Sequence, residues 1–317
     1  MSKKILLSGV KPTGRPHIGN YFGAMKQFVD MQEGHESYVF IADLHALTTV
    51  QNAGEMEQGI IDIVLDYLAI GLDPEKVVLF KQSDVPQVAE LAWIFNCLTT
   101  MPYLMRAHAF KDAEAKNKEI NVGLFDYPIL MAADILIQDT DVVPVGQDQR
   151  QHVEIARDIV EKFNRIFNVD TFKLPNAMIL EGMATVPGTD GQKMSKSYRN
   201  TIPLFSTDEE IKKLEMSIVT DSSGDTPANV RAIHELFRDK EYLDNLYAEK
   251  KGKYKDLKEA LSNDVIAFIS PLRTRRHELE NNKDMIMEIL KKGGKIARDR
   301  AEAKMEVVRK AIGVKLY

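Results

Sequence analysis

The first half of the chain alternates short apolar runs with longer amphipathic stretches. Four runs rich in Val, Ile and aromatic residues predict buried strands over residues 5–7, 38–41, 77–80 and 141–145. The amphipathic pattern between them predicts helices over residues 55–70 and 149–168. Strands that alternate with helices are typical of a parallel α/β sheet, which binds ligands outside the carboxyl ends of its strands.

The pattern changes after about residue 205, where charged amphipathic helices replace the strand-like runs. The last predicted helix carries an apolar stripe made of Ala297, Ala301, Met305, Val308 and Ile312. A glycine-spaced segment at residues 187–191 predicts a mobile loop at the junction. We therefore expect an α/β domain over 1–204, a helical domain over 205–296, and a C-terminal helix over 297–317 that packs back toward the α/β domain.

Composition adds a charge asymmetry to this division. The chain has 317 residues, 44% hydrophobic and 28% charged, with a formal net charge of −5, so it is not a globally basic protein. Residues 271–317 nevertheless carry 13 Lys or Arg against 7 Asp or Glu, a net charge of +6, which leaves −11 on residues 1–270. We expect any polyanionic partner to bind near the C-terminal end.

The cysteine content indicates a reducing compartment. Cys97 is the single cysteine, so no internal disulfide can form, and a Cys/His zinc site is not expected. The first apolar stretch is too short for a secretory signal, and no run of about 18 uncharged apolar residues exists to span a membrane. These features predict a cytoplasmic protein with no membrane partner.

The first signature segment, Pro12-Thr13-Gly14-Arg15-Pro16-His17-Ile18-Gly19-Asn20, follows the first predicted strand and opens a helix. Free backbone N–H groups and the helix dipole at such a turn attract phosphate. His17 and Asn20 add side-chain donors, and Gly19 leaves room for a ligand against the backbone. The alternative is a tight turn with a solvent-exposed histidine.

The second signature segment is Lys193-Met194-Ser195-Lys196-Ser197, just after the glycine-spaced loop. Two ammonium groups three residues apart can close over a phosphate chain and offset the charge that develops during nucleotidyl transfer. The alternative is a solvated basic loop, but its occurrence together with the first segment favours phosphate chemistry.

Together the two segments resemble the HIGH and KMSKS signatures of class I aminoacyl-tRNA synthetases, with Asn20 in place of the second histidine. The resemblance implies a Rossmann-type catalytic domain that binds ATP, with Mg²⁺ carried by the ATP phosphates and no protein metal site. It implies catalytic roles for His17, Asn20, Lys193 and Lys196. The expected ATP-binding residues are Lys11, Pro12, Thr13, Gly19, Asn20, Gly146, Gln147, Asp148, Val186, Lys193, Met194, Ser195, Lys196 and Ser197.

The middle of the chain is similar to the bacterial tryptophanyl family of these enzymes. The similar segments are residues 127–136, residues 143–149 and His152. Asp134 is a lone carboxylate among apolar residues and needs a donor, which the indole N–H of tryptophan supplies and phenylalanine lacks. The alternative is that Asp134 caps a backbone amide.

The resemblance also implies the rest of the amino-acid site and the partners. Tyr127 and Gln149 would hold the substrate ammonium, and Met131, His45 and Leu7 would line the indole pocket, although Met131 could equally be core. The expected partners are L-tryptophan, ATP, tRNA(Trp) and a second copy of the chain. Three arginines of the helical domain would read the anticodon, namely Arg273, Arg275 and Arg276, unless they only form a solvated face. Residues 91–98 are apolar enough for a dimer interface, or for core.

Three positions depart from the family pattern: Lys11 and Leu44 where Gln is usual, and Leu7 where Phe is frequent. A lysine at position 11 would attract an anion with different hydrogen-bond geometry. Three other functions compete: a tyrosyl-tRNA synthetase, an adenylate-forming nucleotidyltransferase for a small molecule, and a non-catalytic RNA-binding relative. The apolar setting of Asp134 argues against a tyrosyl-tRNA synthetase. The basic helical domain argues against a small-molecule nucleotidyltransferase, and the two intact signature segments argue against a non-catalytic relative.

Overall fold

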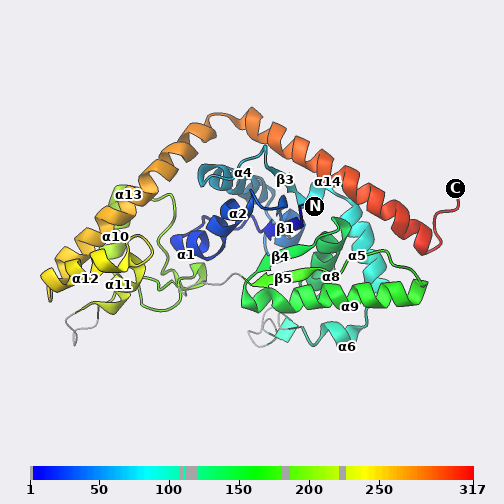
Figure 1. Cartoon of the computed structure of the whole chain (residues 1–317), viewed down its shortest axis with the longest axis horizontal. Coiled ribbons are helices and arrows are strands. Elements are labelled where there is room, and N and C mark those ends of the chain that lie inside the picture. The colour runs from blue at the N-terminus through cyan, green and yellow to red at the C-terminus, as the bar shows by residue number, and fades with distance from the viewer. Residues whose placement is uncertain (1–2, 108–109, 112–113, 115–119, 180–185, 221–225) are drawn as a thin grey trace.

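The computed structural model describes residues 3–107, 110–111, 114, 120–179, 186–220 and 226–317. A sheet of five parallel strands forms its centre (Figure 1). The strands are β1 (Ile5–Val10), β2 (Glu36–Ile41), β3 (Val77–Lys81), β4 (Val142–Val145) and β5 (Asn176–Ile179), in the order β3-β2-β1-β4-β5. The four predicted strands are confirmed. The prediction missed β5 because its four residues are only partly buried and show no apolar run.

The strand order reverses between β1 and β4, since the chain first builds outward through β2 and β3 and then continues on the other side of β1. A crevice at such a switch point is the expected ligand site of an open parallel sheet. Each of the four strands before β5 leads into a short helical segment at its carboxyl end. These segments are α1 (Ile18–Asn20), α3 (Asp43–Ala46), η2 (Gln82–Asp84) and η3 (Gln147–Gln149).

Helices cover both faces of the sheet, so its strands are buried on both sides. The helices α2 (Lys26–Met31) and α4 (Ala53–Ala69) share a core with Val39, Ile41 and Leu79. On the other face, α5 (Gln87–Leu98), α8 (Val122–Ile137) and α9 (Arg150–Phe167) pack over Leu7 and Phe40. The remaining short segments are η1 (Tyr21–Met25), α6 (Met101–Leu104) and η4 (Lys196–Tyr198).

The two predicted helices are confirmed as α4 and α9, and local signals explain their ends. The side chain of Asn52 accepts a hydrogen bond from the Glu55 N–H and caps the start of α4. Gly71 follows that helix with φ +108°, a conformation that favours glycine. Asn168 ends α9 in the left-handed region, at φ 52°.

The second half is helical, as predicted, and in the described part of the chain no strand follows residue 205. Its helices are α10 (Asp208–Met216), α11 (Ala228–His234), α12 (Lys240–Glu249), α13 (Tyr254–Glu280) and α14 (Lys283–Ala311). In Figure 1, α13 rises from the helical part and meets α14, which descends over the sheet. The boundary expected at residue 297 falls inside α14, because that helix is continuous from Lys283.

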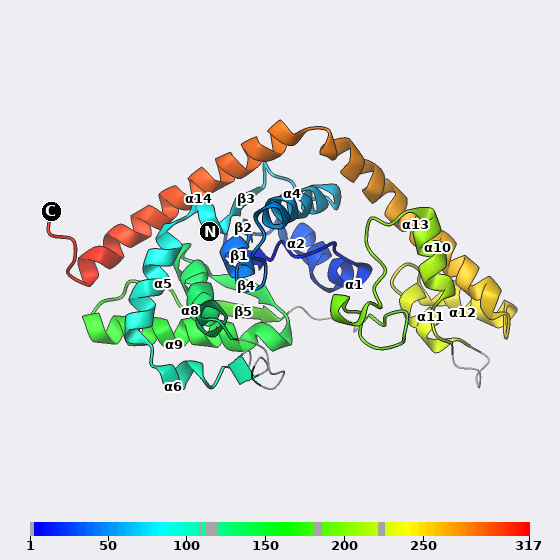
Figure 2. The ribbon, with the colours of Figure 1, turned by 180° about the vertical axis from the view of Figure 1, so that it is seen from behind.

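The helix α14 lies directly against β3 and α5, as the view from behind also shows (Figure 2). Four of the five predicted stripe residues, Ala297, Ala301, Met305 and Val308, are fully buried against the sheet domain. Ile312 is only partly buried, because α14 ends at Ala311 and not at residue 317 as expected. At Gly293 the helix comes so close to β3 that a Cβ atom would lie 2.0 Å from the Leu79 carbonyl oxygen. A side chain at this position would push α14 off the sheet.

Two of the three arginines expected to face RNA are instead engaged within the protein. Arg276 has only 16% of its side chain exposed, and it donates to Asp66 at 2.6 Å and Asp62 at 2.7 Å on α4. Arg273 donates to Asp208 at 2.7 Å. Arg275 is exposed as expected. The sequence prediction was wrong for Arg276 because only the tertiary packing brings the acidic face of α4 against α13.

A buried carboxyl group makes the helical part sensitive to pH. Glu215 on α10 is fully buried, and in the described residues neither carboxyl oxygen has a hydrogen-bond partner. Burial raises the pKa of Glu215 to about 8, against a smaller opposing effect of Ser262. The folded chain therefore keeps this proton between pH 4.5, the ordinary pKa of Glu, and about pH 8, whereas the unfolded chain releases it. Stability contributed here falls as pH rises through that window.

We expect Glu215→Gln to raise the free energy of unfolding at pH 8.5 by about 3 kcal/mol while changing it little at pH 5. The neutral amide removes the cost of ionising a buried carboxyl group. Urea unfolding at pH 5, 7 and 8.5 measures the effect. Glu259→Gln, at an exposed position on the neighbouring helix α13, is the matched control. A stability gain that is equal at all three pH values would contradict the titration of Glu215.

Candidate active site

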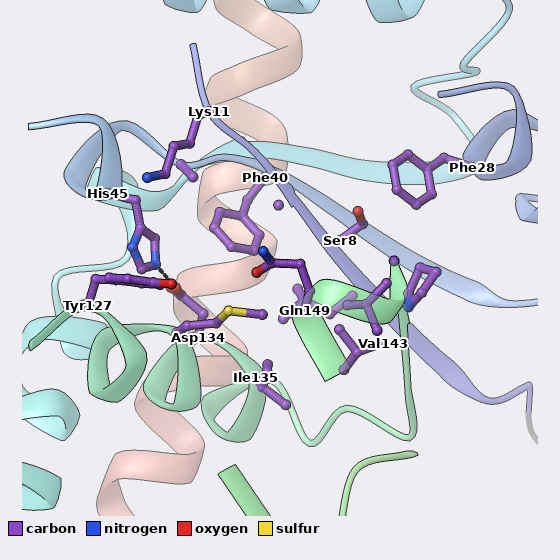
Figure 3. A pocket seen from close by; sticks show the side chains of 17 residues that line it. Ser8, Lys11, Phe28, Phe40, His45, Tyr127, Asp134, Ile135, Val143 and Gln149 are labelled. Carbon is purple, nitrogen blue, oxygen red and sulfur yellow. Dashed lines mark hydrogen bonds and ion pairs between the residues drawn. The ribbon is translucent and has the colours of Figure 1, made fainter. Parts of the chain in front are cut away.

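A cavity of about 380 Å³ opens at the switch point, between the carboxyl ends of β1 and β4 (Figure 3). All six residues expected to bind tryptophan line it: Leu7, His45, Tyr127, Met131, Asp134 and Gln149. They come from β1, α3, α8 and η3, so the tertiary fold brings together residues up to 142 positions apart in the sequence. Lys11 and Gly146, from the expected ATP set, line the same cavity.

Asp134 lies in the wall of this cavity, with 4% of its surface exposed. The Gln82 Nε2 donates to both of its oxygens, at 3.0 and 2.9 Å, and His45 Nε2 lies 3.0 Å from Oδ2. Burial raises the pKa of Asp134, and the contacts with His45 and Gln82 oppose that rise. The carboxylate thus has protein donors that the sequence did not reveal. Since two carboxylate oxygens accept about four hydrogen bonds, they retain capacity for a ligand N–H.

The sequence analysis missed Gln82, which does not line the cavity itself but binds Asp134. It is 1% exposed, and its Oε1 accepts from the His45 N–H at 3.2 Å while its Nε2 holds Asp134. Asp43 fixes the turn around it, because its Oδ1 accepts from the backbone N–H of Ser83 at 3.0 Å. A signal existed: Gln82 directly follows β3, at the sheet edge where ligands bind.

The lining of the cavity also includes a cation and further polar groups. Lys11 Nζ lies 5.7 Å from the centroid of the Tyr127 ring, and desolvation lowers the pKa of Lys11. The Tyr127 hydroxyl lies 2.8 Å from His152 Nε2. Figure 3 shows Tyr127 and Asp134 on α8, with His45 and Lys11 on the facing side of the cavity. The cavity is therefore lined by both a cation and a buried carboxylate.

The first signature segment forms the start of α1. His17 Nδ1 accepts from the Asn20 N–H at 3.3 Å, and Asn20 Oδ1 accepts from the His17 N–H at 3.1 Å. Desolvation, with a smaller contribution from Lys196, lowers the pKa of His17 to about 4, so the ring is neutral at pH 7. Because Nδ1 accepts, the proton sits on Nε2, which is a donor.

The second signature segment lies against the first. The Lys196 ammonium donates to the carbonyl oxygens of Thr13, at 2.6 Å, and Gly14, at 3.0 Å. The backbone following the second segment pairs with the first, since the Ile18 N–H donates to the Ile202 oxygen at 3.0 Å. Desolvation lowers the pKa of Lys196. The structure thus places the ammonium group of Lys196, the ring of His17 and the start of α1 close together.

The other expected ATP residues have different environments. Met194 and Val186 are buried in the core, where the Met194 N–H donates to the Val186 oxygen at 2.8 Å. Lys193, Ser197 and Gln147 are exposed. Asp148 belongs to the turn η3, but its side chain lies outside the described residues. Among the residues that the structure describes, no group of three or more His, Cys, Asp or Glu side chains is arranged to hold a metal ion.

The family of class I tRNA synthetases for tryptophan and tyrosine (W and Y) matches residues 2–295 of the chain. The match covers far more than half of the sequence and includes both signature segments. The chain is therefore a class I aminoacyl-tRNA synthetase, an enzyme of the ligase class.

Individual relatives narrow the family. The chain is 47% identical to a tryptophan–tRNA ligase of Fusobacterium nucleatum, over 97% of each chain, and 44% identical to that of Rhodopirellula baltica, over 98% and 99%. A crystal structure of tryptophanyl-tRNA synthetase from Campylobacter jejuni, complexed with ADP and tryptophan, superposes with a TM-score of 0.91 at 44% identity, covering 98% and 99%. The chain belongs to the bacterial tryptophanyl-tRNA synthetases.

Proposed function

We propose that this enzyme activates L-tryptophan with ATP in the switch-point cavity and then transfers it to the terminal ribose of tRNA(Trp). The buried carboxylate of Asp134 in a largely apolar cavity is the observation that carries the choice of amino acid. The names of the relatives support it, as does the Campylobacter complex with ADP and tryptophan.

In this proposal, Asp134 accepts the indole N–H of tryptophan. His45 and Gln82 hold the carboxylate in place, so it needs no rearrangement when the substrate enters. Met131 and Leu7 contact the apolar faces of the indole ring. An amino acid without a ring N–H leaves the buried acceptor unpaired, which is the physical basis of discrimination.

Tyr127 and Gln149 would bind the substrate ammonium, and Lys11 would attract the substrate carboxylate or an ATP phosphate. The cation of Lys11 lies at the same cavity as Tyr127, as this role requires. A lysine carries a point charge on a flexible stem, whereas the glutamine usual at this position offers a directed amide. We therefore infer that anion binding here depends more on charge than on hydrogen-bond direction.

In the first step, a carboxylate oxygen of tryptophan forms a bond to the α-phosphorus of ATP, and the bond from that phosphorus to the bridging oxygen of pyrophosphate breaks. The protein forms no covalent bond; it positions the reactants and stabilises negative charge. The neutral His17 donates from Nε2, Asn20 from its amide, and Lys193 and Lys196 supply positive charge. Mg²⁺ bound to the ATP phosphates would add further charge neutralisation.

The remaining ATP contacts that we propose are backbone and small side-chain contacts along the two signature segments and the turn after β4. They involve Pro12, Thr13, Gly19, Gly146, Gln147, Asp148, Val186, Met194, Ser195 and Ser197. For Lys196 to reach a phosphate, its ammonium must exchange the carbonyl oxygens of Thr13 and Gly14 for phosphate oxygens. Val186 and Met194 are buried, so they would support the loop rather than bind polar groups.

In the second step, the 2′-hydroxyl of the terminal ribose attacks the carbonyl carbon of the adenylate and releases AMP, as class I membership implies. We propose the division expected from the sequence into an α/β part and a helical part that reads the anticodon, with α14 as one continuous helix and no boundary at residue 297. Arg275 is the arginine of the original three that stays exposed for this role.

The described helices include none that is long and apolar enough to cross a membrane. The single cysteine supports a cytoplasmic location.

A homodimer is also proposed, through the exposed face of α5 and its neighbours. Within residues 91–98, Leu91 and Phe95 are fully buried in the core, whereas Trp93 is 70% exposed. Met101 and Val122, on neighbouring helices, are 61% and 80% exposed. Contiguous exposed apolar patches are typical of an interface, and we propose that these three side chains contribute to one. Measuring the mass of the protein in solution tests whether it is a dimer.

The direct test of the function is amino-acid-dependent exchange of labelled pyrophosphate into ATP. Tryptophan, tyrosine and phenylalanine are compared in the presence of Mg²⁺. We expect exchange with tryptophan at a kcat/KM at least about 1,000-fold above that with phenylalanine, because phenylalanine leaves Asp134 unpaired. Exchange with tyrosine in preference to tryptophan would overturn the substrate assignment. Absence of exchange with all three from folded protein would overturn the activity.

A further inference from the structure

Asn200 is a buried polar residue to which the mechanism above gives no role, although it lies three residues after the second signature segment. Its surface is 2% exposed. Its side-chain Oδ1 accepts from the Ser195 N–H at 2.8 Å, and its Nδ2 donates to the Lys193 carbonyl oxygen at 3.1 Å. One side chain thus binds the backbone at two positions of the signature segment.

Asn200 also contacts the glycine-spaced segment before the signature segment. Its side-chain Nδ2 donates to Asp190 Oδ1 at 2.7 Å, and the backbone oxygen of Asn200 accepts from the Thr189 N–H at 3.0 Å. The amide of Asn200 lowers the pKa of Asp190. At Gly188, a Cβ atom would lie 2.3 Å from the Asn200 side chain, so the loop leaves space for this asparagine only because position 188 is glycine.

Asn200 therefore lies inside a loop whose two sides are also joined by backbone contacts. An isolated antiparallel bridge pairs Pro187 with Lys193, the Gly188 N–H donates to the Gln192 oxygen at 2.6 Å, and the Met194 N–H donates to the Val186 oxygen at 2.8 Å. Beyond these contacts, the hydrogen bonds of Asn200 set how the backbone of Lys193 and Ser195 is oriented. That orientation decides where the two lysine side chains start.

We propose that Asn200 is a positioning residue of the activation step: it fixes the loop so that Lys193 and Lys196 present their ammonium groups to the phosphates of ATP. It does not contact substrate, because it is buried beneath the segment. The inference rests on the lysine roles proposed above. Charge stabilisation requires groups placed where charge develops, and a displacement of about 1 Å can lower the rate about 100-fold.

The test compares Asn200→Ala with the unaltered enzyme in the pyrophosphate exchange assay, with rates normalised to the active sites that form adenylate in a single-turnover burst. We expect kcat to fall about 100-fold and the KM for tryptophan to stay within about twofold, because the tryptophan cavity contains no residue of this loop. Normalisation removes any loss of folded protein. A merely structural role would lower the active fraction and leave kcat per active site unchanged.

Swapping the residues at positions 190 and 200 should restore part of the lost kcat. Asn200→Asp places a carboxylate beside Asp190 and beside the Lys193 carbonyl oxygen. The negative groups repel each other, which displaces the loop, and we expect kcat to fall. In the double variant Asn200→Asp with Asp190→Asn, the amide at position 190 donates to the carboxylate at position 200, and the Ser195 N–H keeps an acceptor. We expect the double variant to recover about tenfold of the loss in Asn200→Asp.

Trypsin supplies a readout besides activity, since the loop contains Lys193, Lys196 and Arg199. We expect Asn200→Ala to be cut in this loop at least tenfold faster than the unaltered protein. Asn164→Ala is the matched control: that asparagine braces another turn, accepting from the Thr171 N–H at 3.2 Å, and its loss should change neither kcat nor cleavage in the loop.

The outcomes separate this inference from the proposed function. If the unaltered enzyme and Asn164→Ala fail to catalyse exchange, the function is overturned, whereas the trypsin result still reports on Asn200. If Lys193→Ala and Lys196→Ala both retain full kcat, the lysine roles are overturned. If exchange is intact but Asn200→Ala keeps its kcat per active site and its resistance to trypsin, the positioning role is overturned.

Discussion

Replacing Asp134 by alanine lowers kcat/KM for tryptophan in the exchange assay by about 100- to 1,000-fold and leaves the KM for ATP within about threefold. The variant loses the acceptor for the indole N–H. It also leaves the buried donors of Gln82 and His45 without their partner. Both effects act on the amino acid, since the signature segments that serve ATP do not line this cavity.

Asp134→Asn provides the matched control for shape. The amide keeps the volume and one acceptor oxygen but loses the charge, and its own NH₂ group opposes the Gln82 donor. We expect a loss of about tenfold to 100-fold, between those of the unaltered enzyme and Asp134→Ala. Thermal unfolding of both variants checks that the cavity still forms. An equal rise in KM for ATP and tryptophan, or unchanged selection against phenylalanine, would contradict the role of Asp134.

Replacing Lys196 by alanine lowers kcat for adenylate formation by about 100- to 1,000-fold, with the KM for tryptophan within about twofold. Negative charge moves onto the pyrophosphate as the bond to the α-phosphorus breaks, so an ammonium group in this place stabilises the transition state more than the ground state. Single-turnover formation of the adenylate measures the step without product release.

Arg199→Gln is the control for charge alone, because it removes an exposed cation from the same loop. It should leave kcat within about threefold. A second readout follows from the neighbourhood of Lys196: its positive charge helps to lower the pKa of His17, so this pKa should rise from about 4 when the charge is removed. Titration of the His17 ring by NMR measures it. An unchanged kcat in Lys196→Ala would remove this lysine from the mechanism.

Local sequence signals predicted the elements well where burial alone decides them. The runs in β1 to β4 are buried on both faces and read as strands without any tertiary information. The strand β5 is short and partly exposed at the edge of the sheet, so it carries no comparable signal. Likewise, four of the five residues of the predicted apolar stripe are buried on α14, but the start of that helix at Lys283 lies in a segment rich in charge, which concealed it.

The sequence analysis predicted which residues line the candidate site, but not which side chains bind one another there. The residues expected to bind tryptophan were named from the sequence, and the structure gathers them around one cavity. The sequence treated Asp134 as a lone carboxylate, whereas Gln82 and His45 already hold it. It placed Arg276 on an open surface, whereas Asp62 and Asp66 of α4 bind it. Each of these pairs lies far apart in the chain.

By itself, the sequence of this protein determined the parallel α/β fold, the helical second half and the residue types of both signature segments, because these depend on local periodicity and short strings. The tertiary structure alone decided which side chains meet: Lys196 at the carbonyl oxygens of Thr13 and Gly14, Gln82 at Asp134, and α13 on α4. The physical reason is that hydrogen bonds and ion pairs act over a few ångströms, and only the packing of elements around the switch point brings distant residues within that range.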